Sequence, residues 1–257
     1  LSSVFLNACD PNFNSPVGDT SSYSAGDADF SRYVAVGDSL TAGYADSALY
    51  RSGQENSFPN ILANQFKAVG GGVFNQPLMN DNLGCLVFGA TASTTYTNRL
   101  VLDAATSSPE PIVGTPTNEV IIGAPILSGT FNNTGVPGAK SFHLGSSGYG
   151  SAAGLLVPTP TSNPYFVRFA SSTITTVITD AATQATTFFT LWIGNNDVLS
   201  YATGGGIGTD RTGNPDPTTY STNDITDPAF FAGTYNSLLS ALTTNNPAAK
   251  GVLINIP

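Results

Sequence analysis

The fold of this chain is decided at Arg32-Tyr33-Val34-Ala35-Val36-Gly37-Asp38-Ser39-Leu40, where an apolar run gives way to a polar turn. The run up to Val36 is typical of a short strand, and the residues after Gly37 are typical of a turn that leads into a helix. Ser39 is therefore expected at a strand end and a helix start, where free N–H groups and the helix dipole favour an anion. This placement predicts an exposed nucleophile. The alternative is an ordinary helix N-cap at Ser39, with Asp38 completing the turn.

Two later segments have the same character of a strand end followed by polar residues. The first is the turn-rich stretch Asn133-Thr134-Gly135-Val136-Pro137-Gly138-Ala139-Lys140-Ser141, which could direct a backbone N–H group at a ligand. The second is the strand-like run Thr187–Ile193, which is followed by Gly194-Asn195-Asn196-Asp197. It places a carboxamide just past a strand end, where open α/β sheets hold ligand-binding groups.

In this order, the three blocks resemble the SGNH (GDSL) esterase and lipase superfamily, over residues 32–257. The resemblance implies that Ser39 is the nucleophile and that Asp38 supports its turn. It also implies an oxyanion hole made of the backbone N–H groups of Ser39 and Gly138 and the side-chain amide of Asn196. Each preorganised donor of this kind lowers the barrier of an acyl transfer by roughly 3 kcal/mol. The resemblance implies no cofactor and no metal.

The chain departs from the family pattern in its general base, which those enzymes carry in a late Asp-x-x-His block. No Asp-x-x-His occurs in the sequence, and residues 251–257 are typical of the strand that precedes that block. We therefore expect a truncated sequence whose base lies beyond Pro257. His143 is the only histidine. It could replace that base, but packing of its ring against Phe142 and Leu144 is the favoured interpretation, because a near-neutral pKa does not supply geometry.

The first residues indicate where the protein resides. Residues 1–9 resemble the end of a signal peptide with a bacterial lipobox, in which Cys9 is lipidated and anchors the chain to a membrane of the cell envelope. The alternative is a frayed segment with an ordinary cysteine. Residues 10–31 are polar and predict a flexible tether. An acylated Cys9 would leave Cys85 as an unpaired, buried residue.

Composition and charge narrow the functional classes. With 257 residues and 40% hydrophobic content, the chain can form one large core. Only 10% of the residues are charged, the net charge is −9, and the basic residues are scattered, so nucleic acid is not an expected partner. The sequence has no metal-type Cys/His cluster, no Gly-x-Ser-x-Gly elbow, no His-Glu-x-x-His and no P-loop.

The predicted architecture is a three-layer α/β/α sandwich around a mostly parallel sheet. Helices are expected at Ser57–Phe66 and Asp227–Asn245, from their terminal signals and apolar spacing. Residues 74–130 predict a hairpin-rich insertion, which could set substrate choice or be decorative. Residues 202–226 predict a solvated flap with three aspartates. The sheet is expected to include the strands Tyr33–Val36, Phe188–Ile193 and Val252–Ile256.

These expectations favour ester hydrolysis through a serine acyl-enzyme, in a lipid-anchored protein of the bacterial cell envelope. The substrate would be a small-molecule ester, a lipid or an acetylated glycan. The rival hypothesis is a non-catalytic surface lipoprotein that binds a glycan or lipid in the same cleft.

Overall fold

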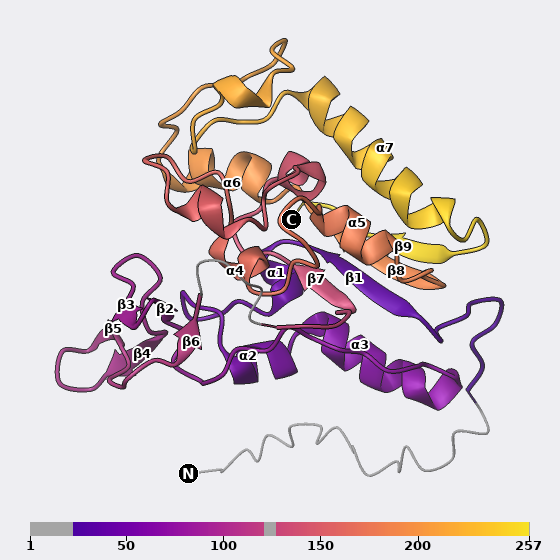
Figure 1. The fold of residues 1–257 in the computed structure, drawn as a ribbon, viewed down its shortest axis with the longest axis horizontal. Helices are drawn as coiled ribbons and strands as arrows, with labels where there is room; N and C mark the ends of the chain where they lie inside the picture. The colour runs from indigo at the N-terminus through magenta and orange to yellow at the C-terminus, as the bar shows by residue number, and fades with distance from the viewer. Residues whose placement is uncertain (1–22, 121–126, 257) are drawn as a thin grey trace, which may run out of the picture.

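A parallel sheet lies at the centre of the molecule (Figure 1). A computed structural model describes residues 23–120 and 127–256, so Cys9 lies outside the described residues. The sheet has four strands in the order β7-β1-β8-β9, and each neighbouring pair is parallel. The prediction of a mixed α/β fold with a mostly parallel sheet is confirmed. The strands are β1 (Tyr33–Gly37), β7 (Asn133–Gly135), β8 (Phe188–Trp192) and β9 (Lys250–Leu253).

Helices pack on both faces of this sheet because side chains alternate along its central strands. On one face, Tyr33 and Ala35 of β1 pack against Ala63 and Phe66 of α3 (Phe58–Phe66). On the other face, Val34 and Val36 share a core cluster with buried residues of α5 (Val177–Ala182) and α7 (Pro228–Thr244). Both faces of β1 are thus buried, as its unbroken apolar sequence predicts.

The two longest helices begin as the sequence predicts, and the remaining helices are short. Pro59 occupies the first turn of α3. Asp227 caps α7, as expected, because its Oδ1 accepts a hydrogen bond from the Phe230 N–H group (2.7 Å). The other helices are α1 (Ser39–Ala42), α2 (Arg51–Glu55), α4 (Pro164–Val167), α6 (Asn196–Thr203) and the 3₁₀ helices η2 (Lys67–Val69), η3 (Ser141–Gly145), η4 (Ala152–Leu155) and η5 (Pro217–Thr219).

The last strand differs from its prediction in position and in environment. β9 spans Lys250–Leu253 instead of Val252–Ile256, because its register pairs Phe188 with Lys250 and Leu191 with Leu253. The apolar residues of 251–257 are those expected of a buried strand. In the structure β9 is an edge strand, and Val252 and Leu253 are 47% and 48% exposed.

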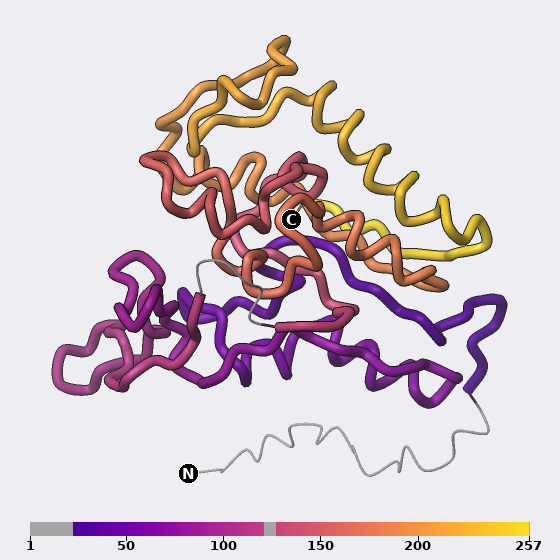
Figure 2. The backbone as a smooth tube through the Cα atoms, viewed as in Figure 1, coloured from indigo at the N-terminus to yellow at the C-terminus, as the bar shows by residue number. Residues whose placement is uncertain are grey.

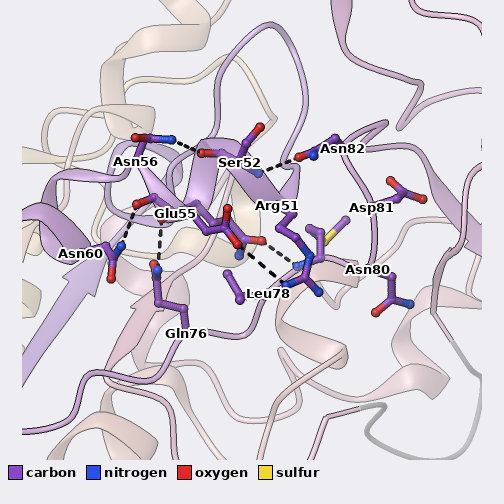
Figure 3. A network of polar contacts seen from close by, with 12 residues as sticks. Arg51, Ser52, Glu55, Asn56, Asn60, Gln76, Leu78, Asn80, Asp81 and Asn82 are labelled. Carbon is purple, nitrogen blue, oxygen red and sulfur yellow. Dashed lines mark hydrogen bonds and ion pairs between the residues drawn. The ribbon is translucent and has the colours of Figure 1, made fainter.

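The insertion between β1 and β7 contains the expected hairpins and lies to one side of the central sheet (Figure 2). Two antiparallel pairs occur in it, β2 with β3 and β4 with β5, and β6 runs parallel to β2. α2 is hydrogen-bonded to the first part of the insertion, since the Ser52 N–H group donates to Asn82 Oδ1 (2.7 Å; Figure 3). The insertion strands are β2 (Leu86–Phe88), β3 (Thr91–Ala92), β4 (Leu100–Asp103), β5 (Ser108–Pro111) and β6 (Asn118–Glu119).

The loop between α6 and α7 is less solvated than its composition predicts. Asp210 and Asp216 are exposed, as expected, but Asp224 is only 3% exposed. Its carboxylate accepts hydrogen bonds from Arg211 Nε (2.6 Å) and from the Ser221 N–H group (2.8 Å). The prediction of a solvated Asp224 is therefore wrong, because Arg211 of the same loop and the backbone N–H groups of Ser221 and Thr209 compensate its charge.

Candidate functional site

The turn after β1 presents Ser39 as the sequence predicts. Ser39 is the first residue of α1 and is half-exposed. The N-cap is Asp38, whose Oδ1 accepts from the Leu40 N–H group (3.0 Å), so the alternative of Ser39 as the N-cap is wrong. Gly37 is required for close packing, since a Cβ atom there would lie 2.2 Å from the Trp192 carbonyl oxygen. α1 has only one turn, so free N–H groups, more than a helix dipole, are what it offers an anion.

Gly138 follows β7 at the same edge of the sheet. Gly135, the last residue of β7, is the register partner of Gly37, and the Val136 N–H group donates to the Gly37 carbonyl oxygen (2.9 Å). Gly138 itself is exposed and has a φ of +80°. A Cβ atom would meet nothing within 4 Å, so glycine is favoured here by the backbone conformation and not by crowding.

Asn196 follows β8, which pairs with the opposite side of β1. It is half-buried at the start of α6, and its Nδ2 donates to the carbonyl oxygen of Ala139 (2.9 Å). One amide hydrogen is thus used to reach the residue after Gly138, and the second hydrogen remains for another acceptor. The three predicted segments therefore leave three adjacent parallel strands at one edge of the sheet.

Three consecutive residues that follow β8, at the start of α6, connect these segments. Asn195 donates from Nδ2 to Asp38 Oδ2 (2.7 Å), which joins the β8 segment to the Ser39 turn. Asn196 reaches Ala139, as described above. Asp197 accepts from Ser141, from the backbone N–H at Oδ2 and from Oγ at Oδ1 (2.8 Å each).

Burial shifts the pKa values of three ionisable side chains in these segments. Asp38 is fully buried and Asp197 is 2% exposed. Burial raises the pKa of both carboxyl groups, although the hydrogen bonds that they accept oppose this effect. Lys140 is also buried, and its Nζ donates to the Asp224 carbonyl oxygen (2.8 Å). Burial lowers the pKa of Lys140, while the charges of Asp197 and Asp224 act in the opposite direction.

Two buried polar atoms near Ser39 have no hydrogen-bond partner in the described part of the chain: Thr41 Oγ1 and Asn195 Oδ1. An unsatisfied buried polar atom costs about 1–3 kcal/mol. Three further atoms of this kind lie outside the predicted site segments, Asn98 Oδ1, Arg168 Nε and Thr226 Oγ1, so the feature does not by itself mark the site.

His143 lies in η3, five residues after Gly138, and its side chain is held by a hydrogen bond and by packing against aromatic rings. Its Nδ1 accepts from the Lys140 N–H group (3.0 Å), and its ring stacks on Tyr149 with centroids 4.8 Å apart. Burial and the Lys140 charge lower the pKa of His143 to about 4. The ring also contacts Phe142, with centroids 4.5 Å apart. These contacts support the packing interpretation over that of a base.

Asn195, Asp197 and Ser141 also belong to the predicted site segments, but their residue types alone predict no role for them. The signal that could have found them is the run of three polar residues after a buried strand. A cavity of about 660 Å³ lies elsewhere, between η3, α5 and α7, lined by Phe142, Phe230 and Leu238 among others. It includes none of the predicted site residues.

Within residues 23–120 and 127–256, no cluster of three or more His, Cys, Asp or Glu side chains suited to a metal ion is found. Cys85 is buried, as predicted, and forms no disulfide within the described residues, which do not include Cys9. None of the described helices combines the length and the apolar character needed to cross a bilayer. Comparisons of the chain with protein-family models, with curated proteins and with solved structures find no match.

Proposed function

We propose that this protein hydrolyses esters through an acyl-enzyme on Ser39, with an SGNH-like three-layer α/β/α fold. The supporting observation is the meeting of three strand-end segments: Ser39 after β1, Gly138 after β7 and Asn196 after β8. An acyl-transfer intermediate carries its charge on one oxygen, and N–H donors converging from separate segments suit that charge. In this proposal the Ser39 and Gly138 N–H groups and the free amide hydrogen of Asn196 bind the oxyanion.

The substrate in this proposal is a small-molecule ester, a lipid or an acetylated glycan, with Cys9 as the anchor to the envelope. The general base is assigned to none of the described residues, because His143 Nδ1 already accepts a hydrogen bond. This engagement of the only histidine also favours a second candidate function, in which the same three segments bind a glycan or lipid ester without cleaving it.

Turnover of p-nitrophenyl acetate by the full-length protein tests the nucleophile. Ser39→Ala is expected to lower kcat by on the order of 10³-fold or more, since a serine hydrolase without its nucleophile retains only oxyanion and binding effects. Ser240→Ala, which alters an exposed serine on α7, is the matched control and should leave kcat unchanged. Turnover that is the same with and without Ser39 would exclude the acyl-enzyme. A protein that binds the ester but never cleaves it would support the second candidate.

A further inference from the structure

We propose that Asp197 is a positioning residue that holds the Asn196 amide and the Gly138 segment at one fixed spacing. The inference rests on the ester hydrolysis proposed above and deepens it. Asp197 follows Asn196 directly, and its partner Ser141 is three residues after Gly138. The pair therefore connects the two segments that would supply the oxyanion donors from outside the nucleophile turn.

The contact has two parallel connections, which fix orientation as well as distance. Asn196 Nδ2 donates to the Ala139 carbonyl oxygen (2.9 Å). One residue further along α6, both carboxylate oxygens of Asp197 accept from Ser141 (2.8 Å each). A single hydrogen bond would let the Gly138 segment rotate about it. The added two-point contact at Asp197 removes that freedom.

Asp197 acts on geometry and not by touching a substrate, since it is 2% exposed and Ser141 is fully buried. Burying a carboxylate between two loops lowers the stability of the folded protein, because the charged group loses its hydration. The Lys140 charge lowers the pKa of Asp197, and the charge of Asp197 raises the pKa of Asp38. Burial has the largest effect and raises the pKa of Asp197, so the contact is maintained at a cost to stability.

The central variant is Asp197→Asn in the full-length protein, assayed with p-nitrophenyl acetate. Asparagine has the same shape but is uncharged and has only one acceptor oxygen. If that oxygen stays on the Ser141 N–H group, the NH₂ group meets the Ser141 hydroxyl, which must then turn from donor to acceptor, so the charge-assisted contact at this point is lost. We expect kcat to fall about 10–100-fold, because displacement of a catalytic donor by about 1 Å has an effect of this size. KM is expected to stay within about twofold, since ground-state binding does not use the oxyanion donors fully.

The chain offers a matched control in a second Asp–Ser pair with the same pattern. Asp180 on α5 accepts from the Ser171 N–H group (3.0 Å) and from Ser171 Oγ (2.5 Å). Asp180 lines a small cavity with Gly129 and Phe131, which precede β7 and so lie away from the carboxyl ends of the strands. Asp180→Asn is expected to lower the melting temperature by a similar amount or less and to leave kcat unchanged.

Ser141→Ala keeps the backbone N–H donor, so it is a milder second variant in case Asp197→Asn does not fold. Its kcat is expected to fall less than that of Asp197→Asn, and the double variant should not fall by the product of the two factors. The inference is overturned if Ser39→Ala is inactive while Asp197→Asn and Ser141→Ala, measured per folded molecule, turn over as fast as the parent. If Ser39→Ala itself retains full turnover, the proposed ester hydrolysis fails and the positioning role fails with it.

Discussion

At the scale of single residues, two glycines allow α1 to lie directly on the sheet. Gly37 ends β1 and Gly135 ends β7, and the two are register partners. A Cβ atom on Gly135 would lie 2.3 Å from the Ala42 backbone nitrogen, which belongs to α1. Since α1 begins at Ser39, any displacement of this helix would also displace the candidate nucleophile.

Gly135→Ala is expected to destabilise the protein by about 1–3 kcal/mol, the usual cost of overpacking, because the clash is with backbone atoms that cannot rotate away. Gly233→Ala provides the contrast. Gly233 is exposed within α7, and a Cβ atom there meets nothing within 4 Å. Gly233→Ala should stabilise the protein by about 0.5–1 kcal/mol, because alanine is the better helix former. Urea denaturation measures the free energy of unfolding of both variants. Equal effects of the two variants would contradict the packing of α1 described here.

At the scale of elements, the sequence predicts best where local signals decide. The bounds of α7 differ from the expected Asp227–Asn245 only at the capping residues, because Asp227 and Pro228 are strong start signals. The predicted β9 starts two residues too late and ends three residues too late. The pairing with β8, a long-range property, includes Lys250 and Gly251 in the strand. The Asp197–Ser141 contact spans 56 positions, so no local pattern could reveal it.

Asp227 is the element-scale test, because one side chain joins α7 to the preceding loop. Its Oδ1 caps the helix at Phe230, and its Oδ2 accepts from the Gly213 N–H group (2.7 Å). Asp227→Ala is expected to cost about 1–2 kcal/mol, since it removes the cap and leaves a second donor unpaired. Asp227→Asn keeps one acceptor oxygen and should cost less. Thermal and urea unfolding report both values; an alanine variant as stable as the parent would show that the cap contributes nothing.

At the scale of the whole molecule, the sequence predicted the three segments of the candidate site but not the charges that surround them. The strand-end positions of Ser39, Gly138 and Asn196 follow from local patterns and from the parallel arrangement of their strands. The burial of Asp38 and Lys140 depends on packing between segments that are distant in the sequence. Stability should therefore respond to pH through groups that composition alone would treat as solvated.

His143 gives the clearest case of such a pH response. Its pKa falls from 6.5 to about 4 in the folded protein, through burial and the Lys140 charge. A lowered pKa means that the unfolded chain binds the proton more tightly. The contribution of His143 to the free energy of unfolding is thus present above pH 6.5 and is lost as the pH falls from 6.5 to 4, by about 3 kcal/mol in total.

The variant His143→Gln tests this pH dependence, since it keeps an acceptor for the Lys140 N–H group but does not titrate. Asp38 and Asp197, whose raised pKa values act in the opposite direction, are common to both proteins and cancel in the comparison. Urea unfolding at several pH values should therefore show that the parent loses about 3 kcal/mol more than His143→Gln between pH 6.5 and 4. Parallel pH curves for the two proteins would mean that His143 titrates in the folded state as it does in water, and that its ring is not held by Lys140 and Tyr149.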